Sequence, residues 1–199
     1  MYKTGLAFFW AIFIWSGIYP KDYATWLLET LPAVIVIIAV IGTRKHFPLT
    51  PLAYCLIFAH CIILLIGGHY TYAEVPLFDM LKDIFGFERN NYDKVGHFMQ
   101  GFNPAIVSRE ILIRNDVFRN RNWLNFMIIC ICLALSAIYE MIEWWTALFS
   151  EDGAEAFLGT QGYHWDTQSD MAFALMGAIL ALLTLSRIHD RQLNTLKSA

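Results

Sequence analysis

Acidic and imidazole side chains recur at one-turn spacing in three apolar stretches of the C-terminal half of the chain. These stretches carry Asp93, His97 and Gln100, then Glu140 and Glu143, then Asp166 and Asp170. Residues three or four apart share one face of an α-helix, so the members of each group are expected to point in one direction. Because an ionisable group at the centre of a membrane span costs about 2.5–3.5 kcal/mol, these groups require partners or a function.

Carboxylates that gather in a space of low dielectric constant cannot all stay ionised unless a cation balances them or some are protonated. A bound Zn, Mg or Mn ion would suit carboxylate and imidazole ligands and would activate water for hydrolysis. Protonated carboxylates would instead indicate a proton-coupled path or a buried hydrogen-bond network. The spacing leaves these alternatives open.

Candidate residues can be assigned to each kind of chemistry. Glu140, Glu143 and Asp170 are the candidate catalytic carboxylates, since the two glutamates lie in the interior of an apolar stretch. The candidate metal ligands are His97, Glu140, Glu143 and Asp170, and the supporting polar residues are Asp93, Gln100 and Asp166. The E-x-x-E spacing of the two glutamates differs from the E-x-x-H pattern of di-iron bundles. No H-E-x-x-H, G-x-S-x-G or phosphate-binding glycine loop is present.

Several of the polar residues have structural roles as an alternative to catalysis or metal binding. Asp93 and Asp166 stand where helix N-caps are common, and Lys94 would serve as an ion-pair partner at the rim. His60 is expected to be a hydrogen-bonded core histidine. His189 falls at the cytoplasmic rim, where it needs no special role.

The elements that position these residues are predicted to be membrane-spanning helices. Of the 199 residues, 57% are hydrophobic and 16% are charged, which is more apolar than a soluble domain. A span needs about 20 apolar residues, and about six stretches qualify. They are Gly5 to Tyr19, Trp26 to Ile41, Pro51 to Tyr72, Val95 to Ile113, Trp123 to Phe149 and Asp166 to Ile188. We therefore predict an all-α, polytopic helical bundle that forms one membrane domain over residues 1–199.

The distribution of basic residues predicts the orientation of this bundle. Alternate loops and ends hold Lys3, Arg44, Lys45, Arg109, Arg114, Arg119, Arg121, Arg187, Arg191 and Lys197. Short cytoplasmic loops retain positive charge, so both termini are expected in the cytoplasm and the acidic and imidazole groups in the outer half of the membrane. Glu29, His69 and His164 are expected near the same level. Between the third and fourth spans, residues 74–92 could form a short helix along the outer surface.

Three motifs carry a resemblance to a known family. DKVGHFMQGF from Asp93, YEMIEWW from Tyr139 and GTQGYHWDTQSDMAFALMGA from Gly159 resemble the signature of the YjdF family of bacterial inner-membrane proteins. The D-K-x-x-H-F pattern of Asp93 to Phe98 is more distantly similar to VanZ-like membrane proteins. The resemblance implies a multi-pass protein of the bacterial inner membrane, in a family without an assigned activity.

Three functions fit these expectations. The first is an enzyme that acts on a lipid or lipid-linked envelope substrate at the outer leaflet, with the carboxylates or a metal providing the chemistry. The second is a small transporter coupled to protons or cations, and the third is a structural membrane protein whose polar groups only hold helices together. The lipid bilayer is the expected partner, and the net charge of -3 argues against nucleic acid.

Overall fold

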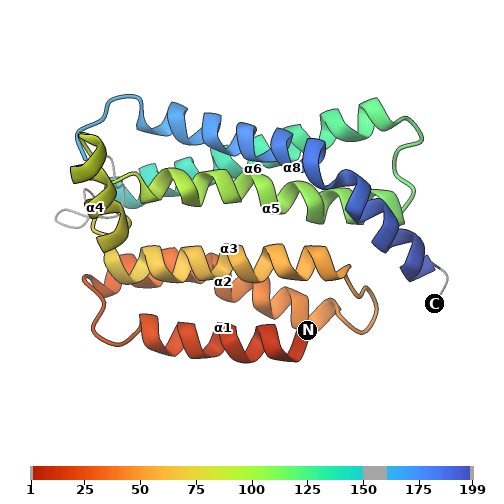
Figure 1. Cartoon of the computed structure of the whole chain (residues 1–199), viewed down its shortest axis with the longest axis horizontal. Helices are drawn as coiled ribbons and strands as arrows, with labels where there is room; N and C mark the ends of the chain where they lie inside the picture. Colours follow the sequence, from red (N-terminus) through yellow and green to blue (C-terminus); the bar gives the residue numbers. More distant parts are fainter. Residues whose placement is uncertain (1, 150–160, 198–199) are drawn as a thin grey trace.

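The computed structural model of the chain describes residues 2–149 and 161–197, and all regular structure within these ranges is helical. The helices are α1 (Tyr2–Ser16), α2 (Tyr23–Thr43), α3 (Pro51–Tyr70), α4 (Pro76–Phe85), α5 (Tyr92–Arg114), α6 (Arg121–Phe149) and α8 (Asp166–Lys197). The long helices lie side by side along the long axis of the molecule, and the short helix α4 crosses one end (Figure 1). The first two residues of the Gly159 motif lie outside the described ranges.

Local sequence signals explain where several helices begin and end. Asp22 caps α2, and its side chain accepts a hydrogen bond of 2.6 Å from the backbone N–H of Thr25. This bond stabilises the ionised carboxylate and lowers the pKa of Asp22 from 3.8. Thr50 caps α3 in the same way and is followed by Pro51 in the first turn. Helix α4 ends at Gly86, whose φ of 67° suits glycine.

Most helices differ from the expected spans by two or three residues at one end or both, and α1 and α8 show physical reasons for such differences. Helix α1 ends at Ser16 and not at Tyr19, because the chain leaves the helical conformation before Pro20, with Tyr19 in the left-handed region at a φ of 52°. Ser16 Oγ donates to the carbonyl of Phe13 and accepts a hydrogen bond of 3.1 Å from Trp26 Nε1. The chain then turns into α2. Helix α8 continues beyond Ile188 to Lys197, where Leu193 still packs inside the protein with 3% exposure. The expected span ended at Ile188 because it followed the apolar stretch alone, and the extension of α8 beyond that residue is amphipathic.

Helices α2, α3, α6 and α8 are long and apolar enough to cross a membrane by length and composition, which agrees with an all-helical membrane protein. Helix α1 is apolar but only 15 residues long. Helix α5 has 23 residues and carries Asp93, Lys94, Arg109, Glu110 and Arg114, which lower its hydropathy. The expected count of six spans and their orientation therefore remain predictions.

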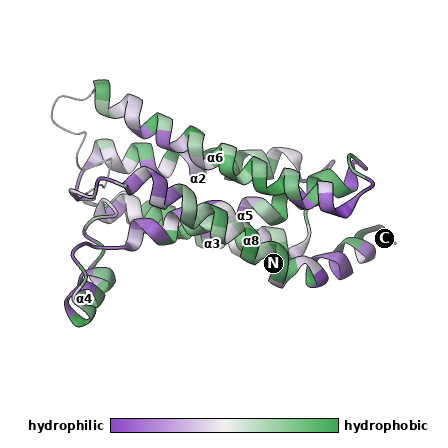
Figure 2. Cartoon of the chain, turned by 90° about the horizontal axis from the view of Figure 1, so that it is seen from above, coloured by the Kyte–Doolittle hydropathy of each residue, from purple (hydrophilic) through white to green (hydrophobic). Residues whose placement is uncertain are grey.

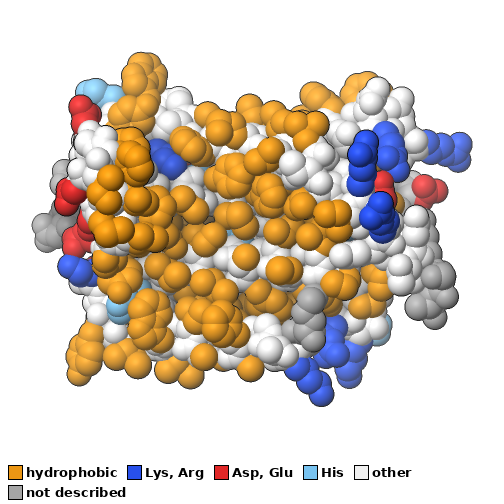
Figure 3. Space-filling view, viewed as in Figure 1, with side chains coloured by type: hydrophobic (Ala, Val, Ile, Leu, Met, Phe, Trp, Pro, Cys, Tyr) orange, Lys and Arg blue, Asp and Glu red, His pale blue; other side chains and the backbone are white. Residues whose placement is uncertain are grey.

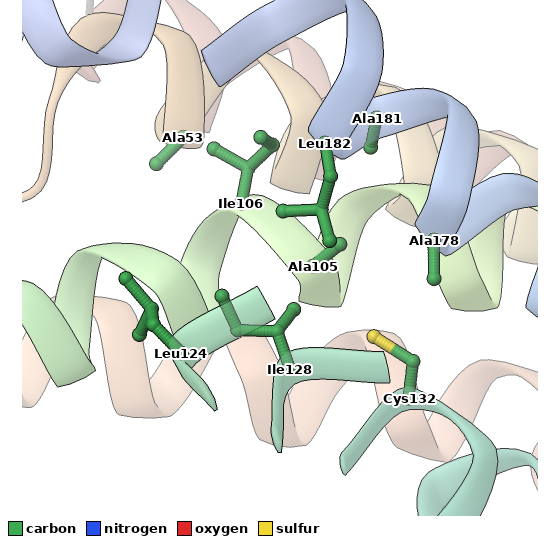
Figure 4. Close-up of a cluster of buried hydrophobic side chains, with 9 residues drawn as sticks. All are labelled: Ala53, Ala105, Ile106, Leu124, Ile128, Cys132, Ala178, Ala181 and Leu182. Carbon is green, nitrogen blue, oxygen red and sulfur yellow. The ribbon is translucent and has the colours of Figure 1, made fainter. Parts of the chain in front are cut away.

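Helix α5 occupies the interior of the bundle, where it packs against α3, α6 and α8. One apolar core lies between these helices, with Ile106 of α5, Ile128 of α6 and Ala178 of α8 fully buried (Figure 4). The backbones of α5 and α8 touch, since a Cβ atom at Gly101 would overlap the carbonyl of Ala174. This contact aligns the first turns of α5 and α8 with each other.

The outer surface of the bundle is apolar between two polar ends. Hydrophobic side chains cover a broad band of the face in Figure 3, and most of the basic side chains on that face lie at its right end. We call this the basic end, where α5 ends at Arg114 and α6 begins at Arg121. The opposite end, where α5 and α8 begin, we call the acidic end. Helix α4 stands out sideways there, as the view from above shows (Figure 2).

Candidate functional site

The sequence-predicted polar groups come together at the acidic end of the bundle. Helices α5 and α8 begin there and α6 ends there (Figure 1), so the three predicted helix faces converge. We define the acidic cluster as the six side chains that these helices contribute, none of which is more than 8% exposed. They are Asp93, His97, Glu140, Glu143, Asp166 and Asp170.

His97 lies at the centre of the acidic cluster and faces three carboxylates. Its Nε2 atom is 3.2 Å from Asp93 Oδ1 and 3.9 Å from Asp170 Oδ1. Its Nδ1 atom is 3.6 Å from Glu140 Oε1 and 3.1 Å from Gln100 Oε1. Both ring nitrogens therefore face oxygen acceptors, an arrangement that the doubly protonated imidazolium satisfies on both sides.

Lys94 joins helix α5 to helix α8 through the aspartates. Its ammonium nitrogen is 2.6 Å from Asp166 Oδ1, 2.6 Å from Asp170 Oδ1 and 3.4 Å from Asp93 Oδ2. Arg89 adds a second cation, which pairs with Asp166 and lies 3.4 Å from Asp93 Oδ2. Lys94 was expected at the rim, but its side chain is only 9% exposed and belongs to the interior of the site.

Glu140 and Glu143 occupy the side of the cluster formed by α6. Glu140 Oε1 is enclosed, and no hydrogen-bond donor among the described residues reaches it. Glu143 lies within electrostatic range of Glu140, His97 and Glu29. An enclosed carboxylate oxygen without a donor is costly in a membrane protein, so Glu140 is poised to bind a proton or a ligand group.

Of the three residues expected near the same level, one joins the site. Glu29 of α2 is buried, and Glu29 Oε2 accepts a hydrogen bond of 2.8 Å from the hydroxyl of Tyr139. His69 instead lies 2.9 Å from the carbonyl of Ser16 through Nδ1 and stacks against Trp15. The His164 side chain is exposed on the surface of the protein. The site therefore extends toward α2 and not toward α1.

Charge counting shows that the site has a surplus of carboxyl groups. With Glu29 the site holds six carboxyl groups, against two permanent cations and one imidazole. Even with His97 charged, six negative charges would face three positive ones. In a space of low dielectric constant such an excess is resolved by protonation or by a further cation. The site is thus built to hold exchangeable protons or a cation.

A metal ion would find some of its ligands here. Asp93, His97 and Asp170 each offer a ligand atom within 4.8 Å of one another. Asp93 was expected only as a supporting residue, whereas Glu140 and Glu143 lie outside this closest group. However, the Lys94 ammonium is already 2.6 Å from Asp170 Oδ1, so a metal would meet a fixed positive charge. A bound metal therefore remains a prediction, with the Lys94 ammonium as a competing cation.

A cavity of about 720 Å³ adjoins the acidic cluster at its α5–α8 side. Val95, Phe98 and Phe173 provide an apolar wall, and Arg89 and Lys94 provide charged groups. The Tyr163 ring lies 5.8 Å from each of these cations and shields them on one side. A volume of this size suits a drug-sized ligand or the polar part of a lipid.

Two further polar groups lie along α5 below the acidic cluster. In the middle of the bundle Asn103 Nδ2 is 3.3 Å from His60 Nδ1, which confirms the expected hydrogen bond of His60, whose side chain is half-buried. At the basic end His189 is fully buried, 3.1 Å from Glu110 and 3.0 Å from Arg109. His189 was expected at the rim, but the structure buries it, because α8 continues past the predicted end of its span.

Comparison with known proteins gives the following matches. The family model described as "Predicted membrane protein (DUF2238)" matches residues 1–191. The inner membrane protein YjdF of Escherichia coli (strain K12) is 52% identical over 182 residues, which cover 92% of this chain and 87% of that protein. No solved structure matches the chain.

Proposed function

The chain belongs to the family described as "Predicted membrane protein (DUF2238)" and is a multi-pass inner-membrane protein, and on this premise we propose an enzymatic function for its acidic cluster. The proposed enzyme acts on the polar part of a lipid or lipid-linked envelope substrate. Glu140, Glu143 and Asp170 with His97 supply the acid–base chemistry.

The observation that carries this proposal is the position of Lys94. Its side chain lines the cavity, and its ammonium is 2.6 Å from Asp170 in the acidic cluster. A ligand in the cavity would therefore be in contact with Lys94, which is ion-paired to the cluster. The apolar wall at Phe98 and Phe173 suits the hydrocarbon part of such a ligand.

The proposed chemistry is hydrolysis of an ester in the polar part of the substrate. Glu140 takes a proton from water, and the water oxygen forms a bond to the ester centre while the bond to the leaving oxygen breaks. The leaving oxygen takes a proton from the His97 imidazolium. The proton on Glu140 then returns to His97, 3.6 Å away, which restores the starting state.

The orientation of the protein determines which leaflet supplies the substrate. The loops and helix ends at the basic end contain Arg44, Lys45, Arg114, Arg119 and Arg121. Positive charge is retained on the cytoplasmic side of inner-membrane proteins, so we place the acidic end at the outer face of the membrane. The substrate would then come from the outer leaflet or from an envelope precursor exposed there.

Variants of the cluster test this function in cells. Glu140→Gln, His97→Asn and Asp170→Asn should each remove activity while the protein still accumulates in the membrane. Glu74→Gln is the matched control, because Glu74 is an exposed carboxylate near the same end, in an ion pair with Lys21. Mass spectrometry of envelope lipids and precursors from cells without the protein, complemented by each variant, provides the measurement. Lipid profiles identical for all four variants and for the empty vector would reject the enzymatic function.

The same ion pairs favour a structural role as the second candidate. Lys94 links α5 to two aspartates of α8, which by itself would hold the two helices together. In that case the amount of folded protein in detergent would fall for Lys94 and Asp170 variants but not for Glu140→Gln, and no folded variant would change the envelope lipids.

A further inference from the structure

We propose that α4 and the groove beneath it bind the hydrocarbon chain of a lipid from the leaflet at the acidic end. This rests on the proposed function, since it assigns the apolar part of the same substrate to a defined place. The groove has a volume of about 140 Å³ and is lined by Phe78, Leu81, Phe85, Phe87 and Asn91.

Helix α4 has the composition of a helix that lies in a membrane interface. Its apolar residues Leu77, Met80 and Ile84 recur at one-turn spacing and are 57%, 52% and 65% exposed. Asp79, Lys82 and Asp83 share another face at spacings of three and four. No residue of α4 is buried. A short helix with opposed apolar and charged faces lies flat between lipid headgroups and hydrocarbon.

The position of α4 directs its apolar face toward lipid. It crosses the end of the bundle (Figure 1) and stands out beyond the side of α3 (Figure 2). The side chain of Asn90 holds it there, with Nδ2 donating to the carbonyl of Val75 at 3.0 Å and to Asp79 Oδ1 at 2.9 Å. The Phe78 ring also packs edge-on against Tyr92, with centroids 5.2 Å apart. The leaflet beside the bundle is therefore what this face meets.

The lining of the groove selects a hydrocarbon occupant. Four of its lining residues are aromatic or aliphatic, and none is charged. A peptide backbone placed there would lose its hydrogen bonds to water and find only the Asn91 side chain in exchange, which is unfavourable. A lipid chain has no such requirement. We therefore assign the groove to a lipid chain and not to a protein segment.

The groove continues into the larger cavity. Phe87 and Asn91 line both spaces, and the cavity also contains Lys94. A single lipid can thus place its chain under α4 and its polar part beside Lys94. In this arrangement the substrate enters the cavity laterally from the bilayer, along α4.

Photo-crosslinking tests the assignment. The purified full-length protein is placed in nanodiscs that contain a phospholipid with a diazirine in its acyl chain, and the labelled peptides are identified by mass spectrometry. We expect labelling concentrated on residues 76–91. Leu81→Asn with Phe87→Asn should reduce this labelling about threefold or more, since it removes apolar contact area from the groove. Lys82→Gln, on the charged face of α4, is the matched control and should label like the unchanged protein.

The outcomes separate this inference from the proposed function. Labelling should persist in the Glu140→Gln variant, because chain binding does not need the acid–base groups. If that variant labels normally and also retains its effect on envelope lipids, the proposed function fails while the chain site stands. Labelling spread over the apolar surface of all helices, with no effect of the double substitution in a folded protein, would overturn the chain site. A co-purified protein that occupies the groove and leaves residues 76–91 without lipid label would also overturn it.

Discussion

The substitution Lys94→Met tests how the acidic cluster is held together. It removes an ammonium that lies 2.6 Å from both Asp166 and Asp170 and has a side chain only 9% exposed. Removing one partner of a buried ion pair costs about 3–5 kcal/mol of unfolding free energy, because the remaining charge is left without compensation. Methionine keeps the length and apolar stem of the side chain, so packing losses should be small.

The contacts around Lys94 narrow the expected loss of unfolding free energy. Asp166 keeps its pairing with Arg89, whereas Lys94 is the one permanent cation within 4.0 Å of Asp170 among the described residues. We therefore expect a loss of about 3 kcal/mol, at the lower end of the range for breaking a buried pair. Adding Asp170→Asn to Lys94→Met should recover about 1–2 kcal/mol, because it removes the uncompensated charge.

Reversible unfolding in mixed micelles with increasing SDS, followed by circular dichroism, measures these changes. Lys21→Met is the control, because the Lys21 and Glu74 side chains are both 54% exposed and their ion pair should contribute little. A Lys94→Met protein within about 0.5 kcal/mol of the unchanged protein would refute the electrostatic account of the cluster.

Three further predictions concern other parts of the fold. Gly101→Ala should lower the unfolding free energy by about 1–3 kcal/mol, because the added methyl overlaps the backbone of α8. Gly42→Ala is the control in the same assay and should not destabilise the protein, because the space around Gly42 is open. His60→Leu alone should cost about 1–3 kcal/mol because it leaves Asn103 unpaired, and His60→Leu with Asn103→Leu should cost less than the sum of the two single changes in a double-mutant cycle. Asp22→Ala should cost about 1 kcal/mol or less at neutral pH through the lost helix cap. The lowered pKa of Asp22 means that this contribution is present above the unfolded pKa of about 3.9 and disappears as the pH falls through the folded pKa, so unfolding curves of the two proteins should converge in acid.

Each of these predictions has a contrary result. A Gly101→Ala protein as stable as Gly42→Ala would mean that α5 and α8 do not touch there. Strict additivity in the double-mutant cycle would mean that His60 and Asn103 do not interact. A stability deficit of Asp22→Ala that stays constant down to pH 2 would mean that the carboxylate charge plays no part in the cap.

The helical class and the helix faces that carry the polar residues could be predicted from sequence, because they depend on local periodicity. The helix bounds were less predictable, as the ends of α1 and α8 show. The spacing of Asp93 and His97 placed both on one face of α5, and His97 Nε2 lies 3.2 Å from Asp93 Oδ1. The predicted orientation placed Glu140 of α6 in the same half of the membrane as His97, and these two side chains are 3.6 Å apart. Spacing and depth along a helix are properties that a single sequence carries.

The partners of the polar groups could not be predicted, because they depend on how closely two helices approach. Lys94 was expected at the rim, but the close contact at Gly101 draws α5 against α8 and places the ammonium between two aspartates. The burial of His189 likewise depends on the extension of α8 past its apolar span. Neither the crossing of helices nor a cavity between them follows from the period of one segment.

The most direct test of the enzymatic function is turnover by the purified protein. The protein is reconstituted in proteoliposomes with a total envelope lipid extract, and lipids and released polar fragments are quantified by mass spectrometry over time. The account predicts that one lipid species is consumed and that a matching product accumulates with the unchanged protein and with Glu74→Gln, but not with Glu140→Gln or His97→Asn. Equal lipid composition in all four samples, or equal turnover by the cluster variants, would contradict it.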